Sequence, residues 1–186
     1  GYLVTSDLIV AQNADTSLKG VMFVNSVLES SSDMPYAIDR DEAGGNSLAE
    51  IVNSAIKYLD NKNGFFIMVE GGKIDWASHG NDAATIVHEV YDFDLAILEA
   101  LAFYNLHPDE TLIIITADHE TGGISLGNAI NEYDTDFSML ARQKISVVEF
   151  ASIVKTYKQT HSVYNISDIY ELASNSFYNQ VPIYTA

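Results

Sequence analysis

One stretch of the sequence limits the possible folds more than any other, namely the apolar run Phe65–Val69 and the polar residues after it. β-Branched and aromatic residues without polar alternation predict a strand buried on both faces. Glu70 then lies at the carboxyl end of that strand, where open α/β sheets bind their ligands. Asp75 and His79 are four residues apart, so they share one face if this segment is helical. Carboxylate and imidazole together are ligands that suit zinc.

A second stretch follows the same plan. The apolar run Thr111–Ala117 predicts another buried strand, and Asp118 and His119 come directly after it. Two strands that each deliver an Asp and a His to their carboxyl ends are much less expected by chance than one. A helix predicted from about Asp82 to Phe103 connects the two strands, and this alternation favours a parallel sheet with right-handed crossovers.

These two stretches resemble the metal-binding half of alkaline phosphatases. The first runs from Val69 to Ala83 as Val-Glu-Gly-Gly-Lys-Ile-Asp-Trp-Ala-Ser-His-Gly-Asn-Asp-Ala, and the second from Thr116 to Gly123 as Thr-Ala-Asp-His-Glu-Thr-Gly-Gly. Met34–Tyr36 and Val181–Tyr184 are also similar to that family. The resemblance covers most of residues 1–127 and, weakly, the last few.

The resemblance implies an α/β fold, a three-layer sandwich with a mostly parallel sheet, here incomplete and carrying a small helical cap. Residues 1–127 would be the C-terminal part of the core, 128–178 a helical cap or insertion, and 179–186 a returning edge strand. Further elements are predicted from local patterns, namely strands at 1–5 and 21–24, a surface loop at 29–46, helices opened by capping boxes at Ser47 and Ser146, and a short helix at 166–173.

The resemblance also implies two zinc ions and one magnesium ion. The implied ligands are Asp75 and His79 for one zinc, Asp118 and His119 for the other, and Glu70 for magnesium, with Trp76 beside the phosphate pocket. Each residue has a plainer interpretation. Asp75 could cap a helix, Asp118 and His119 could be surface residues of a turn, Glu70 could pair with Lys73, and Trp76 could serve packing alone.

Several parts of the family's machinery are missing from the sequence. No segment before Glu70 resembles the serine nucleophile motif, and the only arginines, Arg40 and Arg142, do not lie in a phosphate-clamp motif. The third zinc ligand, a His, is expected near Ser176, and His161 lies too far upstream for a direct match. We therefore assign no catalytic residue. A catalytic zinc needs three protein ligands, so these half-sites should bind metal weakly and the chain alone should hardly turn over substrate.

Charge and composition exclude some partners. The chain has 186 residues, a net charge of −17 and no cysteine, and its pI is about 4.3. Strong acidity argues against nucleic acid or an anionic membrane as partner, while bound zinc or magnesium would offset part of it. No apolar run reaches the length of a membrane span. The first residue is not Met, and we interpret Gly1 as an interior start without a signal peptide.

The preferred hypothesis is therefore a fragment of a phosphate monoester hydrolase that needs the missing N-terminal portion. By resemblance only, the parent protein would be periplasmic or extracellular and could form a homodimer. The alternative is an acidic, non-catalytic module that keeps the fold and binds a metal or a partner chain. A different phosphohydrolase or mutase of the same superfamily is less favoured, because of the Glu-Gly-Gly-x-Ile-Asp sequence at residues 70–75.

Overall fold

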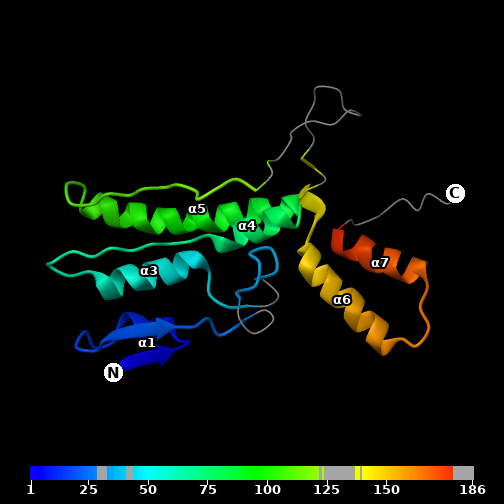
Figure 1. Cartoon of the computed structure of the whole chain (residues 1–186), viewed down its shortest axis with the longest axis horizontal. Helices are drawn as coiled ribbons and strands as arrows, with labels where there is room; N and C mark the ends of the chain where they lie inside the picture. Colours follow the sequence, from blue (N-terminus) through cyan, green and yellow to red (C-terminus); the bar gives the residue numbers. More distant parts are fainter. Residues whose placement is uncertain (29–32, 41–43, 122, 124–136, 139, 178–186) are drawn as a thin grey trace.

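The computed structural model describes residues 1–28, 33–40, 44–121, 123, 137–138 and 140–177 (Figure 1). The predicted edge strand at 179–186 and the acidic turn at 131–136 lie outside the described residues. The elements are β1 (Tyr2–Thr5), α1 (Leu8–Gln12), β2 (Gly20–Phe23), α3 (Leu48–Leu59), α4 (Gly72–His79), α5 (Ala83–Leu106), the 3-10 helix η1 (Leu140–Arg142), α6 (Val147–Thr160) and α7 (Ile166–Phe177).

The N-terminal unit is a small parallel β–α–β arrangement. β1 and β2 pair in parallel, with Tyr2 opposite Gly20 and Thr5 opposite Phe23. Parallel neighbours need a crossover, and α1 lies in it. Asp7 opens α1, because its Oδ1 atom accepts hydrogen bonds from the Ile9 and Val10 N–H groups at 2.8 and 3.2 Å. Both predicted strands are confirmed.

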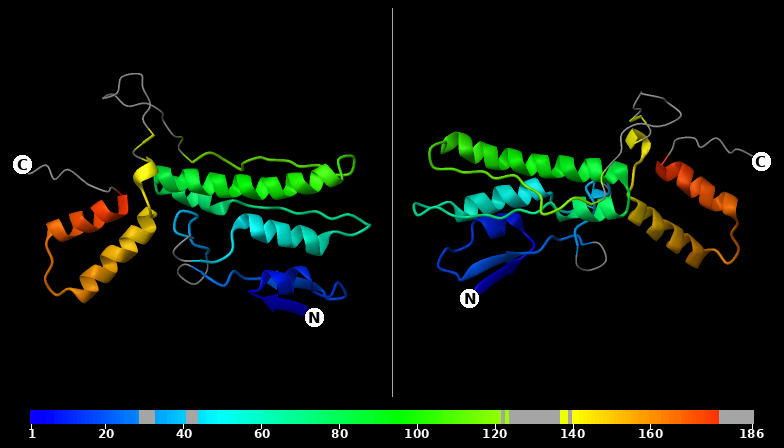
Figure 2. Two further views of the ribbon diagram at one scale, coloured as in Figure 1. Left: turned by 180° about the vertical axis from the view of Figure 1, so that it is seen from behind. Right: turned by 45° about the horizontal axis from the view of Figure 1, so that its top comes forward.

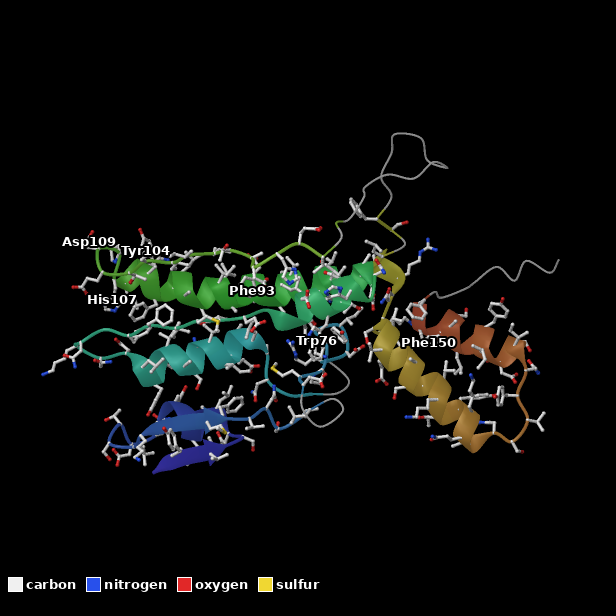
Figure 3. The ribbon with its side chains drawn as sticks, in the orientation of Figure 1. Trp76, Phe93, Tyr104, His107, Asp109 and Phe150 are labelled. Atoms are coloured by element: carbon white, nitrogen blue, oxygen red, sulfur yellow. The ribbon has the colours of Figure 1, made fainter. Side chains whose placement is uncertain are left out.

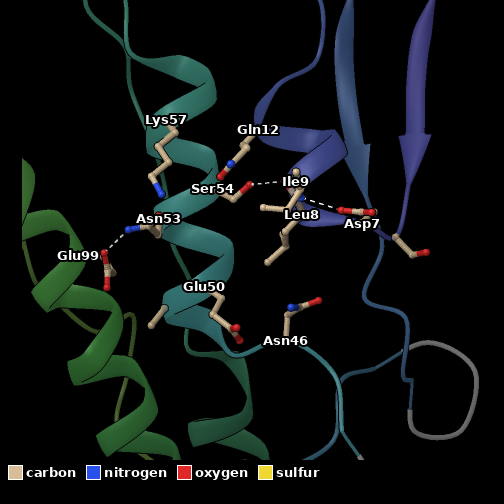
Figure 4. Close-up of a pocket in the computed structure, with 12 residues that line it drawn as sticks. Asp7, Leu8, Ile9, Gln12, Asn46, Glu50, Asn53, Ser54, Lys57 and Glu99 are labelled. Carbon is tan, nitrogen blue, oxygen red and sulfur yellow. Dashed lines mark hydrogen bonds between the residues drawn. The ribbon is translucent and has the colours of Figure 1, made fainter.

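Helix α3 begins with the predicted capping box. The Ser47 hydroxyl accepts from the Glu50 N–H at 3.2 Å, and the Glu50 carboxylate accepts from the Ser47 N–H at 2.8 Å. α3 lies between α1 and α5, and the Ser54 hydroxyl donates to the Leu8 carbonyl at 3.1 Å. These helices line a hollow of about 610 Å³ with mostly polar side chains. Among them, the Asn53 amide donates to Glu99 on α5 (Figure 4).

Helix α5 is the centre of the structure and has 24 residues. It lies beside α3 and α4 in both Figure 1 and Figure 2. Its buried side includes two carboxylates. The Asp92 carboxylate accepts both Arg40 guanidinium nitrogens at 2.7 and 3.0 Å, and the Glu89 carboxylate accepts the Ala37 N–H at 2.6 Å. These contacts hold the described residues 33–40 against α5.

Two predictions about this region are wrong. Residues 29–46 were expected to form a surface loop, yet Tyr36 and Asp39 are buried, because α5 supplies partners to the loop backbone and to Arg40. The helical spacing of apolar residues also predicts an inward face of α5 made of Ile86, Val90, Phe93, Ile97 and Leu101, and this prediction is wrong in part. Ile86 is buried, but Val90 is half-exposed while Glu89 takes an inward position.

The α6–α7 pair joins the rest of the chain through the start of α6. Asp39 Oδ1 accepts the Ser146 N–H at 2.7 Å, and Asp82 Oδ2 accepts the Val147 N–H at 2.8 Å. Gln143 donates its amide to the other Asp82 oxygen at 2.7 Å. Two carboxylates therefore satisfy free N–H groups at this helix N-terminus, and they complement the positive end of its dipole.

Within the pair, the Phe150 and Phe177 rings meet edge to face, with centroids 5.0 Å apart. The Ser146 hydroxyl also accepts the Glu149 N–H at 3.0 Å, as the predicted cap requires. The described part of 128–178 thus holds η1, α6 and α7. The boundaries of that predicted cap stay a prediction.

The segments 65–69 and 111–117 differ from their prediction as strands buried on both faces. Neither belongs to a strand ladder in the part of the chain that the structure describes. Along 65–69, half-buried and exposed side chains alternate. One face packs on α5, where the Phe65 and Phe103 rings lie 5.3 Å apart. The other face has exposed Phe66 and Met68, because no described element covers it.

The buried pair between Arg40 and Asp92 gives a first prediction. Asp92→Ala should lower the free energy of unfolding by about 3–5 kcal/mol, because it leaves a buried guanidinium without its bidentate partner. Asp94→Ala, at an exposed position on the same helix, should change it by no more than about 0.5 kcal/mol. Urea unfolding followed by circular dichroism measures both. Equal effects of the two variants would contradict this role of the pair.

Glu89 gives a pH-dependent prediction. Burial raises the pKa of this carboxyl above its ordinary value of 4.5, and nearby Asp92 adds to the rise, while the Ala37 N–H, Arg40 and Lys73 oppose it. The pKa of Glu89 is higher in the folded chain than in the unfolded one. The contribution of Glu89 to the free energy of unfolding is therefore fully present below the ordinary pKa, and it is lost as pH rises through the folded pKa. Glu89→Gln should remove this loss. We expect the difference in urea midpoint, variant minus wild type, to increase as pH rises from near 4.5 to neutrality. A constant difference would contradict it.

Candidate metal centre

Helix α4 positions the first pair of predicted ligands. Asp75 Oδ1 lies 3.2 Å from His79 Nε2, as expected for residues four apart on one helix face. The N-cap of α4 is Gly71, so the alternative role of Asp75 as helix cap is wrong. Asp75 Oδ1 is shielded from solvent and, among the described residues, has no hydrogen-bond partner with the required geometry. A shielded carboxylate oxygen beside an imidazole nitrogen is a donor pair that fits a zinc ion.

The two glycines at the start of α4, Gly71 and Gly72, lie close to neighbouring side chains. A side chain at position 71 would come within 3.0 Å of Ile74 and 3.1 Å of the Phe93 ring on α5. One at position 72 would lie 3.3 Å from a Glu70 carboxylate oxygen. Glycine therefore lets the chain pass close to α5 between Glu70 and Asp75.

The second pair of predicted ligands follows the segment 111–117. Asp118 Oδ2 lies 3.6 Å from His119 Nε2, and both side chains are exposed. The pKa of His119 is raised, first by the hydrogen bond between its ring and the Glu120 carbonyl, then by the Asp118 carboxylate and, more weakly, by Asp75. Asp75 belongs to the first pair of predicted ligands, on α4, far from His119 in the sequence.

A hollow of about 360 Å³ joins the same two parts of the chain. It is lined by Ser78, Asn81, Ala83, Ile86, Glu120, Thr121 and Gly123. The end of α4 and the start of α5 therefore face the residues that follow His119. Asn81 has a φ of 53°, the left-handed conformation that Asn tolerates best among residues other than glycine. This strained position makes the tight connection between α4 and α5.

The other predicted site residues, Glu70 and Trp76, lie in or next to α4, as does Lys73, which was a possible partner of Glu70. Lys73 forms an ion pair with Asp33 at 2.9 Å, and its ammonium nitrogen lies 3.8 Å from the Tyr36 ring centroid and 5.1 Å from that of Trp76. The Trp76 side chain is about half-exposed at 53% (Figure 3). Glu70 is exposed just before α4.

No third ligand joins either pair. Among the residues that the structure describes, no three His, Asp or Glu side chains lie close enough to hold one ion. Ser176, near which a His was expected, is buried, and its carbonyl accepts the Lys144 N–H. His161 ends α6, with its ring stacked on Tyr157 at 3.9 Å. The donor types thus suit zinc, and the donor number falls short of a complete site.

Comparison with known proteins identifies the family. The alkaline phosphatase family profile matches residues 11–183, which is nearly the whole chain. This chain belongs to the alkaline phosphatase family. The predicted resemblance and fold class are thereby confirmed, since the similar structures are alkaline phosphatases as well.

Solved alkaline phosphatases contain the same arrangement as part of a larger fold. The Thermus thermophilus enzyme matches 95% of this chain at a TM-score of 0.71 and 26% identity, and the cold-active enzyme of Shewanella sp. matches 81% at 0.66 and 32%. In both, the match covers 36% of the solved chain.

Curated alkaline phosphatases show the same partial coverage. Alkaline phosphatase 4 of Bacillus subtilis is 40% identical over 129 residues, which are 68% of this chain and 26% of that protein. The repressible alkaline phosphatase of Saccharomyces cerevisiae is 45% identical over 100 residues, or 50% and 18%. The chain therefore spans about a quarter or less of the length of these relatives.

Sequence patterns missed a buried carboxylate beside the candidate ligands. Asp82, three residues after His79, is buried and accepts hydrogen bonds from α6 and Gln143. It also caps α5, because its carboxylate accepts the Thr85 N–H at 3.3 Å. The sequence held no signal for its second partner, α6.

No helix in the described ranges is both long and apolar enough to cross a bilayer.

The shared location of the two motifs can be tested by titration. Asp118→Asn and Asp75→Asn should each lower the pKa of His119, the first by more, because each removes a negative charge that favours the imidazolium. Asp109→Asn is the control, since Asp109 lies toward the opposite end of α5 from Trp76 (Figure 3). NMR chemical shifts of the imidazole against pH give these values. An effect of Asp109 as large as that of Asp75 would contradict the arrangement.

Proposed function

We propose that this chain supplies part of the two-zinc and magnesium site of a phosphate monoester hydrolase. The observation that carries the proposal is the placement of the two Asp–His pairs, since Asp75 lies 3.2 Å from His79 and a hollow of about 360 Å³ joins the end of α4 to the residues that follow His119. Membership of the alkaline phosphatase family supports it. Asp75 and His79 would hold one zinc, Asp118 and His119 the other, and Glu70 the magnesium.

The bound metals would supply positive charge for the phosphoryl group and lower the pKa of an attacking oxygen. This chain's own residues hold and orient them. The Asp75 carboxylate turns its shielded oxygen toward His79, which presents Nε2 on the same side. Trp76 would border the phosphate as a pocket wall, because an indole ring carries no group that can transfer a proton to a phosphate ester.

The same residues explain why we expect the isolated chain to be inactive. Arg40 is committed to Asp92 and Lys73 to Asp33, so neither offers a free cation for a phosphate. Each zinc has two protein ligands here where a catalytic zinc needs three. The serine nucleophile would come from the N-terminal portion of the enzyme, whereas the family pattern places the third ligand of one zinc near Ser176 of this chain, where no His is present. By family resemblance, the parent protein would act in the periplasm or outside the cell, and it could form a homodimer.

A non-catalytic, metal-binding module is the second candidate. The observation that favours it is Ser176, which is buried near the place where the family pattern predicts a histidine ligand. Under this alternative, the acidic chain would bind a cation or a partner protein without hydrolysing an ester.

Zinc content and hydrolysis, measured on the same sample, separate these possibilities. We expect substoichiometric zinc after dialysis and no detectable hydrolysis of a chromogenic phosphate ester, because each half-site lacks ligands. The Asp75→Ala/His119→Ala variant should lose the residual zinc, while Asp109→Ala should keep it. Turnover that the double variant abolishes would contradict the inactive half-site. Tight, stoichiometric zinc without turnover would favour the non-catalytic module.

A further inference from the structure

Helices α6 and α7 form a unit that is joined to the rest of the described chain through the segment before α6. The two helices pack on each other, and the Lys144 N–H connects this segment to α7 by donating to the Ser176 carbonyl at 3.0 Å. Figure 1 and Figure 2 show both helices extending away from the layer of α3, α4 and α5. Residues 143–147 are therefore the point about which the α6–α7 unit can turn.

Two buried carboxylates from distant parts of the chain hold this point. Asp39 Oδ1 accepts the Ser146 N–H at 2.7 Å, and Asp82 Oδ2 accepts the neighbouring Val147 N–H at 2.8 Å. Because these N–H groups are consecutive in the chain, the two carboxylates lie side by side at the start of α6. We call the two carboxylates and the two N–H groups the latch.

The Asp39 carboxylate is only partly satisfied. Its Oδ2 atom is shielded from solvent and has no hydrogen-bond partner among the described residues, whereas both oxygens of Asp82 accept hydrogen bonds. A buried, ionised oxygen without a donor is costly, and a second carboxylate beside it adds repulsion. A proton on Asp39 Oδ2 reduces both costs, and it leaves the bond from the Ser146 N–H to Oδ1 in place.

The surroundings of Asp39 act in the same direction. Burial raises the pKa of Asp39 above its ordinary value of 3.8, the Ser146 hydroxyl and N–H lower it, Asp82 raises it again, and Lys73 lowers it. Lys73 is itself paired with Asp33. The other charged groups on the elements around the latch are Arg40, Glu89, Asp92, Arg142, Lys144 and Glu149.

The position of the latch therefore depends on pH. When α6 moves away, Asp39 meets solvent and its pKa returns toward the ordinary value. The closed latch thus binds the proton more tightly than the open one. Closing is favoured in acid, and this advantage is lost as pH rises through the raised pKa of Asp39.

We propose that the latch is a pH-sensitive device, which holds the α6–α7 unit against the start of α5 when Asp39 is protonated and releases it when Asp39 is ionised. The proton comes from solvent and is carried on Asp39 Oδ2, the oxygen without a partner among the described residues. The Gln143 amide, which donates to Asp82 Oδ1 at 2.7 Å, anchors the segment just before the latch. The device does not depend on the proposed function.

Distances between two spin labels test the latch. The chain has no cysteine, so Asp94→Cys on α5 and Val163→Cys between α6 and α7 give two selective labelling sites. Both positions are exposed. Pulsed electron paramagnetic resonance then measures the distance between α5 and the α6–α7 unit, and circular dichroism at each pH checks that the chain stays folded.

We expect one narrow distance distribution in acid and a second, broader component that grows as pH rises. The ratio of closed to open molecules should fall at least about threefold between about pH 4 and about pH 8, because the proton favours the closed state. Asp39→Asn keeps a carbonyl oxygen for the Ser146 N–H and has no charge at any pH. Its distribution should therefore stay narrow throughout.

A second pair of variants tests the Asp82 side of the latch. Val147→Pro removes the N–H that Asp82 accepts, and proline is tolerated at the first position of a helix. Ser146, with φ −67° and ψ 159°, already has the extended conformation that precedes proline. Val147→Pro should populate the open state at every pH. The matched Val147→Ala, which loses the same side chain and keeps the N–H, should behave as wild type.

Four outcomes would overturn the proposal. These are a wild-type distribution that does not change with pH, the same pH-dependent change in Asp39→Asn, and equal distributions for Val147→Pro and Val147→Ala. The fourth is loss of the change in Glu89→Gln, because the titrating group would then lie on α5, where Glu89 accepts the Ala37 N–H. The wild-type series and the proline–alanine comparison do not require Asp39→Asn to fold.

Discussion

Paired, buried carboxylates hold the described structure together around α5. Asp82 accepts backbone N–H groups at the start of α6, Glu89 accepts that of Ala37, and Asp92 binds both guanidinium nitrogens of Arg40. A buried charge is very costly when it loses its partner, so each segment is fixed to α5 more firmly than apolar contact alone would fix it. The site at α4 depends on this arrangement, because α4 ends three residues before Asp82 and packs on α5.

The features that the sequence alone could predict are those set by residues close together in the chain. The caps at Ser47 and Ser146, the existence of strands β1 and β2 and the Asp75–His79 pair all depend on partners at most four residues apart or on a short local pattern. The inward carboxylates of α5 could not be found in this way. Glu89 and Asp92 bind residues 52 positions away, and hydrophobic periodicity assigned the inward face to Val90 instead.

The candidate site also has one part that local spacing predicts and one part that depends on contacts between distant segments. Helix geometry alone brings Asp75 and His79 together, and this part of the ligand set follows from their spacing. Asp118 and His119 follow a segment whose position depends on strand pairing, and in this structure their side chains are 90% and 57% exposed. Sequence spacing therefore predicts the candidate ligands, but it could not predict how exposed Asp118 and His119 are, because that exposure depends on contacts with residues far away in the sequence.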